Sequence, residues 1–276
     1  MMRMAALILF LIALAGPRSV LDFSEFKTEG IDIVLATDVS GSMAAEDFIL
    51  QGQRRNRLEV VKAVMREFVQ ARRSDRIGMV AFAREAYTVS PLTTDQNWLL
   101  LNLDRLDLGL IEDGTAVGSG LSSALVRLKN SNARSKAVIL LTDGVNNAGQ
   151  IQPLEAAGIA KAMGIKVYTI GAGTRGPVPF PVADIWGRKQ YQAVQIDIDE
   201  ETLKKIASET GGHYFRADNT EALREVYRAI DQMEKTEIKQ YGYREYRELF
   251  PFFLSAGLLL LFAGLLLENT WLMVLP

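Results

Sequence analysis

The stretch that decides the fold is Ile31-Asp32-Ile33-Val34-Leu35-Ala36-Thr37-Asp38-Val39-Ser40-Gly41-Ser42. Its first seven residues are mostly apolar, which is typical of a β-strand buried in a sheet. Three side chains that carry oxygen follow at alternating positions, Asp38, Ser40 and Ser42. One carboxylate and two hydroxyls suit a hard cation such as Mg²⁺, which prefers oxygen ligands in an octahedral shell and usually keeps some waters. The stretch therefore predicts a strand that ends in a candidate metal-binding loop.

Two later segments fit the same site. Glu112-Asp113-Gly114-Thr115 opens a stretch with helical apolar spacing, and Val138-Ile139-Leu140-Leu141-Thr142-Asp143-Gly144 is a second buried-strand pattern that ends on a carboxylate. Ligands of open α/β sheets bind outside the carboxyl ends of the strands. The alternative is an ordinary turn, because Asp, Ser and Gly are common turn residues. The later Thr115 and Asp143, each in the expected order, favour a site.

Strand and helix patterns alternate through the middle of the chain. Arg57 to Gln70 has apolar residues at helical spacing, and Arg76–Phe82 with Ala86–Val89 reads as an antiparallel edge hairpin around Arg84-Glu85. The predicted fold class is α/β, doubly wound, with a mainly parallel central sheet, helices on both faces and flanking membrane segments. The later elements that we expect are a strand at Ile165–Ile170 after a helix capped by Gly164, a helix from Asp199 to Gly211, a last strand at His213–Arg216, and a helix that starts at Asp218-Asn219-Thr220-Glu221.

One glycine-rich segment imitates a nucleotide-binding loop. Gly171-Ala172-Gly173-Thr174-Arg175-Gly176 matches GxGxxG after a strand, but that fingerprint must also open a helix. Three prolines in Pro177–Pro181 forbid the helix. We therefore expect an irregular loop or hairpin from Thr174 to Gln195, in which Trp186 and Tyr191 are candidate contact residues or parts of a surface insertion without a role.

Composition excludes several classes of function. A net charge of −2 offers no basic field for nucleic acid, so no nucleic-acid partner is expected. The absence of Cys removes disulfides and thiolate sites, and a single histidine, His213, cannot build a multi-histidine zinc site. A Mg²⁺-dependent phosphatase that forms an aspartyl phosphate is the nearest enzyme. That chemistry usually needs a second carboxylate as general acid, and Ser40 stands in its place.

Both ends of the chain are apolar. Residues 249–267 carry no charge and are long enough to cross a bilayer, with Tyr241, Tyr243, Tyr246 and Trp271 as a flanking aromatic belt. Ala5 to Ala15 is either a signal-peptide core or a short anchor. The predicted segments are an N-terminal anchor or signal-like segment (1–18), a linker (19–30), the α/β domain (31–237), a juxtamembrane linker (238–248) and a transmembrane helix (249–267).

The side of the membrane is marked by two opposing signals. The excess of basic residues on the domain side predicts a cytoplasmic domain by the positive-inside rule, whereas the signal-like N-terminus predicts export. We favour the exported side of the membrane. The basic residues on the domain side are Arg18, Lys27, Lys235, Lys239, Arg244 and Arg247, against Arg3 alone on the other side.

The set DxSxS, a Thr about seventy residues later, and Thr-Asp-Gly resembles the metal-ion-dependent adhesion site of the von Willebrand factor A (VWA) fold, which is Rossmann-like. The resemblance implies that Mg²⁺ or Mn²⁺ binds to Asp38, Ser40, Ser42, Thr115 and Asp143, directly or through water. If only Asp38 and Asp143 supply charge and one or both act through water, the ion stays under-neutralised, with an open position that a Glu or Asp of a partner protein can fill. We therefore predict a binding protein that is not an enzyme; a metal-independent membrane scaffold is the further alternative.

The whole chain is similar to the VWA membrane proteins of bacterial aerotolerance operons, of the BatA type. This resemblance implies an envelope or ATPase-associated complex, with a MoxR-type AAA+ ATPase and other VWA membrane proteins as partners. The segments that carry it are Glu112-Asp113-Gly114-Thr115-Ala116, Leu141-Thr142-Asp143-Gly144-Val145-Asn146-Asn147-Ala148-Gly149, Tyr168-Thr169-Ile170-Gly171 and Thr210-Gly211-Gly212-His213-Tyr214-Phe215.

Overall fold

A computed structural model describes residues 2–20, 30–72, 74–184, 186, 188–240 and 246–270. The chain forms two compact units, Thr28–Gln240 and Met1–Lys27 with Tyr241–Pro276. Residues 21–29 and 241–245, which include most of the predicted linkers and the predicted interfacial Tyr241 and Tyr243, lie outside the described residues, as do Trp271 and the side chain of Tyr246. The linker boundaries and the aromatic belt therefore stay predictions.

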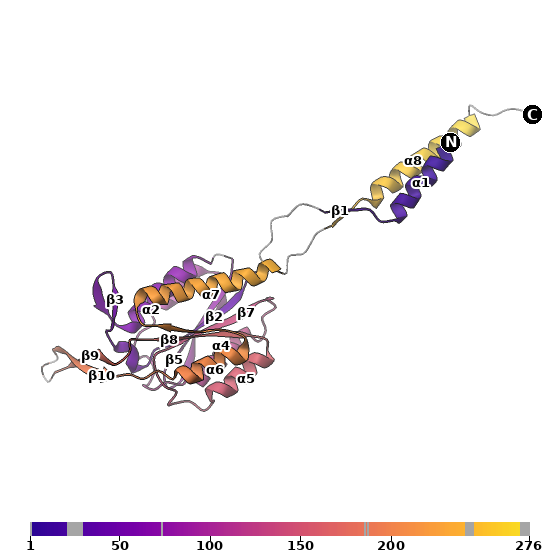
Figure 1. Ribbon diagram of the computed structural model, residues 1–276. Coiled ribbons are helices and arrows are strands. Elements are labelled where there is room, and N and C mark those ends of the chain that lie inside the picture. Colours follow the sequence, from indigo (N-terminus) through magenta and orange to yellow (C-terminus); the bar gives the residue numbers. More distant parts are fainter. Residues whose placement is uncertain are drawn as a thin grey trace, which may run out of the picture. The chain divides into compact units, whose positions relative to one another are not determined.

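A six-stranded sheet forms the centre of the larger unit (Figure 1). All neighbouring strands are parallel except the edge pair β5–β6, which is antiparallel as the sequence predicts. The doubly wound, mainly parallel fold class is thus confirmed. In spatial order the strands are β11 (Tyr214–Ala217), β8 (Lys166–Ala172), β7 (Lys136–Thr142), β2 (Asp32–Asp38), β5 (Arg76–Phe82) and β6 (Ala86–Thr93).

Helices cover both faces of this sheet (Figure 1). Successive side chains of β2 point to opposite faces, so Ile33 and Leu35 join one core while Val34 and Ala36 join the other. Burial on both faces explains why these strands read as continuous apolar runs. On the first face lie α2 (Arg57–Gln70), α3 (Gln96–Asp104) and α7 (Thr220–Gln240), and on the second α4 (Val117–Leu128), α5 (Pro153–Ala162) and α6 (Glu200–Thr210).

Capping residues set the helix boundaries near those that the sequence predicts. The Asn56 side chain accepts a hydrogen bond from the Glu59 amide at the start of α2, and Asp199 does the same for Thr202 at the start of α6. Helix α6 ends at Gly211, whose φ of 75° is a left-handed conformation that favours glycine. These ends fix where each strand returns to the sheet.

Two small hairpins and one short helix complete the domain. The segment predicted as a loop or hairpin is a hairpin of β9 (Pro177–Ala183) and β10 (Lys189–Gln195), and no helix follows the GxGxxG segment. The β3 (Phe48–Leu50) and β4 (Gln53–Arg55) hairpin was not predicted, and η1 is a 3₁₀ helix at Gly41–Ala44. The last strand, β11, starts at Tyr214, one residue after the predicted start at His213.

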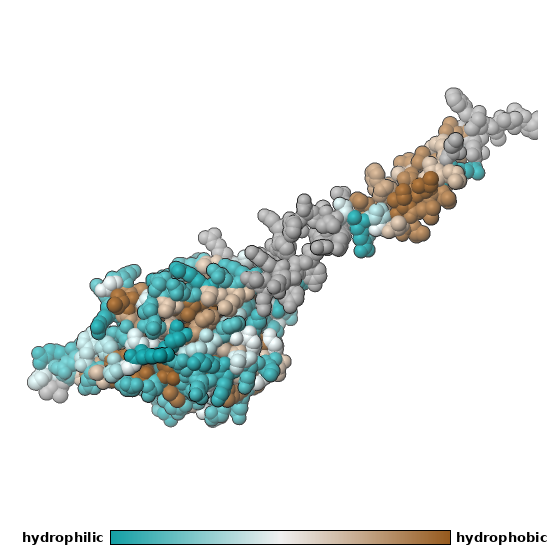
Figure 2. Space-filling model, in the orientation of Figure 1, coloured by the Kyte–Doolittle hydropathy of each residue, from teal (hydrophilic) through white to brown (hydrophobic). Residues whose placement is uncertain are grey.

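The smaller unit is an apolar helix pair. Helix α1 (Met2–Leu14) packs against α8 (Phe250–Thr270), and β1 (Arg18–Val20) pairs antiparallel with β12 (Tyr246–Glu248). Within the described residues, Phe250–Leu267 is the one helical stretch long and apolar enough to cross a membrane. Apolar residues cover nearly all of the drawn surface of this pair, whereas the domain surface is mainly hydrophilic (Figure 2).

Two helical glycines are expected to respond oppositely to alanine. A Cβ at Gly118 in α4 would lie 2.0 Å from the carbonyl oxygen of Ile151, whereas a Cβ at Gly158 in α5 meets nothing within 4 Å. Helix propensity alone favours both substitutions by about 0.5–1 kcal/mol. We expect Gly158→Ala to stabilise the domain by that amount and Gly118→Ala to destabilise it by about 1–3 kcal/mol through overpacking. Urea unfolding followed by circular dichroism measures both, and a stabilising Gly118→Ala would contradict the packing.

Candidate functional site

The candidate site lies at the carboxyl ends of two adjacent parallel strands. Asp38 is the last residue of β2, and Asp143 directly follows β7. Thr37 of β2 pairs with Leu141 of β7, so the two strands end side by side. Ser40 and Ser42 stand on the turn and 3₁₀ helix that leave β2. The structure therefore brings the two predicted carboxylates together at the carboxyl end of the sheet.

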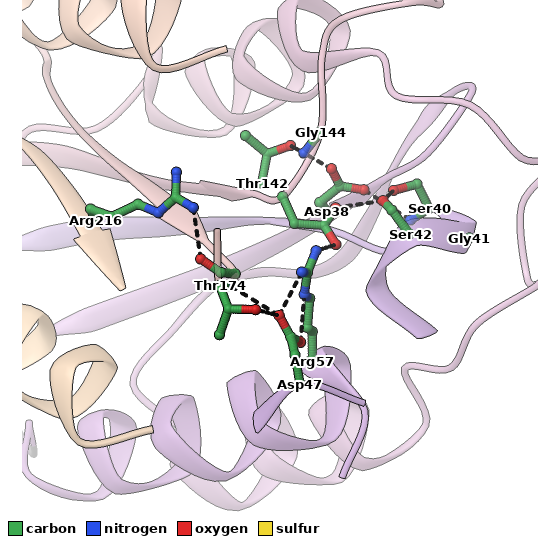
Figure 3. A network of polar contacts seen from close by, with 12 residues as sticks. Asp38, Ser40, Gly41, Ser42, Asp47, Arg57, Thr142, Gly144, Thr174 and Arg216 are labelled. Carbon is green, nitrogen blue, oxygen red and sulfur yellow. Dashed lines mark hydrogen bonds and ion pairs between the residues drawn. The ribbon is translucent and has the colours of Figure 1, made fainter. Parts of the chain in front are cut away.

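Short hydrogen bonds join four of the five predicted residues, Asp38, Ser40, Ser42 and Asp143 (Figure 3). The Ser40 amide donates to Asp38 Oδ1 at 2.8 Å, and the hydroxyls of Ser40 and Ser42 lie 3.0 Å apart. Ser42 Oγ donates to Asp143 Oδ1 at 2.5 Å. Thr142, which the sequence analysis did not include, donates from Oγ1 to Asp38 Oδ2 at 2.5 Å.

Thr115 completes the predicted set from the loop before α4. Its Oγ1 and Ser42 Oγ would lie 3.4 and 3.9 Å from a Cβ placed on Gly144, so both hydroxyls converge above that glycine. The Thr115 amide donates to Asn147 Oδ1 at 2.8 Å, and the Asn147 amide returns a bond to the Thr115 carbonyl at 3.0 Å. All five predicted residues are thus brought together, and Asn147 holds one of them.

A second acidic residue ties this loop to the first motif. Asp113 Oδ1 accepts hydrogen bonds from the amides of Gly41 (2.7 Å) and Gly114 (2.9 Å). A Cβ on Gly41 would lie 2.9 Å from Asp113 Oδ2, so a larger residue at this position would displace the Asp113 carboxylate. The sequence analysis quoted Asp113 inside a motif but assigned it no role. Its role is to hold the Thr115 loop against the Ser40–Ser42 turn.

A buried guanidinium stands behind the site, and the sequence analysis missed it. Arg57 Nη1 donates to Asp143 Oδ2 at 2.8 Å, while Arg57 Nε and Nη2 form a two-pronged pair with Asp47 at 2.9 and 2.6 Å. The Arg57 side chain is 1% exposed. A signal was available, because a basic residue at the first position of a helix opposes the helix dipole unless a specific anion pairs with it.

Charge is unbalanced in this buried cluster. The cluster holds three carboxylates and one guanidinium: Arg57 pairs with Asp47 and Asp143, and Asp38 and Asp143 are fully buried. Burial and then the charge of Asp143 raise the pKa of Asp38 to about 7. Burial also raises the pKa of Asp143, against the opposing charge of Arg57. For Asp47 the hydrogen bonds and charge of Arg57 outweigh burial, so its pKa is lowered.

The donor set fits a hard divalent cation. Among the described residues no group of three or more His, Cys, Asp or Glu side chains is arranged to hold a metal ion. A metal here would therefore need hydroxyl oxygens beside the two carboxylates, which are ligands that Mg²⁺ and Mn²⁺ accept and soft metals disfavour. A charge of +2 would also offset the excess of two buried carboxylates over the guanidinium.

Comparison with known proteins defines the family. The chain belongs to the von Willebrand factor type A domain family, whose model matches residues 32–229. It is 31% identical over 234 residues to an uncharacterized protein of Borreliella burgdorferi. The matched region covers 85% of this chain and 67% of that protein. The predicted VWA family is therefore confirmed.

Two solved structures are similar to the domain. BatB from Bacteroides thetaiotaomicron is 30% identical with a TM-score of 0.60, over 75% of this chain and 98% of that one. An aerotolerance-related membrane protein from Bacteroides fragilis is 29% identical with a TM-score of 0.59, over 76% and 98%. The predicted likeness to aerotolerance VWA membrane proteins is confirmed. Together with the apolar helix α8, this likeness indicates that the chain is anchored in a membrane.

The raised pKa of Asp38 predicts how stability depends on pH. In the metal-free protein Asp38 keeps its proton up to about pH 7 when folded but loses it near pH 3.9 when unfolded. The folded state therefore binds more protons between these values, so stability falls as pH rises, with a slope of up to ~1.4 kcal/mol per pH unit for one proton. Urea unfolding in EDTA from pH 4.5 to 7.5 measures this slope. Asp38→Asn should flatten it, and parallel curves for the two proteins would contradict the assignment.

Proposed function

We propose that this domain binds Mg²⁺ or Mn²⁺ through Asp38, Ser40, Ser42, Thr115 and Asp143 and uses the ion to recognise a partner protein. One observation carries the proposal. Oxygens of two fully buried carboxylates and three hydroxyls converge at the carboxyl end of the sheet, where the guanidinium that pairs with Asp143, that of Arg57, is shared with Asp47. Such a cluster is costly without a further positive charge.

The arrangement favours recognition of an acidic partner. When bound, the ion supplies a Lewis-acidic centre that accepts oxygen ligands. Asp143 divides its two oxygens between Ser42 and Arg57, so one of them is already occupied by a guanidinium. The ligands of the site then leave an open position on the ion that a Glu or Asp side chain of a partner can fill.

We prefer binding to catalysis for a structural reason. An aspartyl-phosphate phosphatase needs a general acid close to its nucleophilic Asp, and the neighbours of Asp38 here are the hydroxyls and amide of Ser40 and Thr142. The carboxylates of Asp143 and Asp47 in the same cluster are both held by Arg57. The proposed activity is therefore ion-dependent binding without turnover.

Membrane anchoring gives the binding domain its context. We propose that α8 (Phe250–Thr270) anchors the chain in the bacterial inner membrane with the VWA domain on the exported side. The likeness to aerotolerance membrane proteins supports a place in an envelope complex. A MoxR-type AAA+ ATPase and other VWA membrane proteins are the partner candidates that the resemblance implies.

Metal binding is tested with two aspartates at opposite ends of β2. Mg²⁺ at a hundred times its dissociation constant should raise stability by ~2.7 kcal/mol, or roughly 5–10 °C in melting temperature. Asp38→Ala should abolish this shift. Asp32→Asn is the matched control, because Asp32 is also buried on β2 but pairs with Arg76 at the other end. Equal Mg²⁺ shifts in wild type and Asp38→Ala would show that the metal site is misassigned, and a metal-independent scaffold would show no shift in any protein.

Partner binding is tested with the intact chain. Cross-linking in native membranes should capture a partner that excess EDTA or Asp143→Ala releases, while circular dichroism of the protein is unchanged, because two large apolar cores hold the sheet independently of the ion. Retention of the partner in EDTA would contradict the proposal. So would a Mg²⁺-dependent phosphatase activity that disappears in Asp38→Asn.

A further inference from the structure

The β9–β10 hairpin is a separate exposed element of the domain (Figure 1). Its strands pair antiparallel, with Pro177, Pro179 and Pro181 at alternate positions of β9. Proline has no amide hydrogen, so the outer edge of β9 is closed to a further strand, and the fixed φ angles stiffen the hairpin. A stiff element loses little conformational entropy when it binds.

The base of the hairpin is fixed to the same framework as the candidate site. Asp47 Oδ2 accepts hydrogen bonds from the amide and the hydroxyl of Thr174, both at 2.9 Å, and Asp47 is also the carboxylate that holds Arg57 against Asp143 (Figure 3). A Cβ on Gly173 would lie 2.7 Å from the guanidinium carbon of Arg57, so glycine is needed where the chain passes that group. One buried guanidinium therefore links Asp143 to the start of the hairpin.

Glu46 makes a second attachment farther along the hairpin. Its amide donates to the Pro179 carbonyl at 2.9 Å, and its carboxylate accepts from the Tyr191 hydroxyl at 2.7 Å and from Lys189. Glu46 and Asp47 follow η1, which carries Ser42, after one intervening residue. The hairpin is thus held beside the site by both strands.

The hairpin presents cations and aromatic rings. Residues 173–195 contain three basic side chains and one acidic one, in a chain whose net charge is −2. The acidic residue, Asp184, accepts hydrogen bonds from the amides of Trp186 and Arg188, and its carboxylate lies 3.3 Å from the Arg188 guanidinium. The Trp186 residue is 72% exposed with the Arg188 guanidinium 5.2 Å from its ring centre, and Tyr191 is 55% exposed. Exposed Trp, Tyr and Arg are the residue types that dominate protein interfaces.

We propose that the β9–β10 hairpin is a second partner-contact element, which binds an acidic protein segment beside the carboxylate that the site recognises. The proposal rests on the proposed function for the identity of the partner. Charge complementarity favours an acidic occupant, because three cations stay more than half exposed although each also pairs with a carboxylate of this domain, and exposed ion pairs are weak enough to exchange partners. The three pairs are Arg175–Glu200, Arg188–Asp184 and Lys189–Glu46. Three cations are fewer than the four to eight of a polybasic lipid-binding cluster, so a protein is favoured over an anionic membrane surface.

Photo-cross-linking in native membranes tests this surface. The full-length protein carries p-benzoylphenylalanine in place of exposed Gln190 on β10, of exposed Glu112 beside the site, or of Trp98 on α3 as a matched exposed control. We expect the same polypeptide to be captured from Gln190 and Glu112 and not from Trp98. Mass spectrometry should place the Gln190 adduct in a segment with excess Asp and Glu. Adducts from Gln190 that are lipids, second copies of this chain or segments without acidic excess would overturn the proposal.

Charge reversal separates this proposal from the metal-dependent one. Arg175→Glu with Arg188→Glu should lower the Gln190 adduct about tenfold or more, whereas Arg127→Glu with Lys205→Glu on α4 and α6 should leave it unchanged. Equal yields in both double variants would overturn the role of the hairpin. If Asp38→Ala leaves the Glu112 adduct intact while the hairpin variant loses the Gln190 adduct, the ion-dependent function fails and the hairpin surface stands.

Discussion

The site depends on one electrostatic constraint, the burial of more negative than positive charge at the ends of two neighbouring strands. Asp38 and Asp143 are fully buried, and Arg57 balances only part of the charge because it also pairs with Asp47. Removing charged groups from water is unfavourable unless they are paired. The loops around the site follow from this constraint, since hydroxyls and amides of Ser40, Ser42 and Thr142 surround the carboxylates.

The sheet makes this constraint possible. Because helices cover both faces, the strands lie in two apolar cores and hold the backbone of β2 and β7 in register up to their last residues. The two carboxylates of the site stand where β2 and β7 leave the sheet. Arg57, at the first position of α2, reaches the strand ends from the helix layer, and Gly173 leaves room for it. The core thus positions the site without contributing to its chemistry.

The parts of the site that could be predicted from sequence are local in the chain. Apolar runs that end in Asp38 and Asp143, the DxSxS spacing and the Thr115 loop each lie within one short segment, and the structure brings them together as expected. Asp47, Arg57 and Asn147 could not be placed in the same way, because their roles arise from contacts between segments that are distant in sequence, such as the 86 residues between Arg57 and Asp143. Spacing within a motif carries no information about such a partner.

The contacts that were missed change how the site is understood. From the motif alone, Asp143 is a ligand with two free oxygens, and the loop before the hairpin is unrelated to it. In the structure Arg57 takes one of those oxygens, and its other donors bind Asp47, which in turn holds Thr174. A change in charge around Asp143 therefore alters the ion pair of Arg57, whose other partner, Asp47, fixes the base of the β9–β10 hairpin. The proposed metal site and the base of the hairpin share one buried ion pair, so a partner that contacts both would be bound by a single rigid framework.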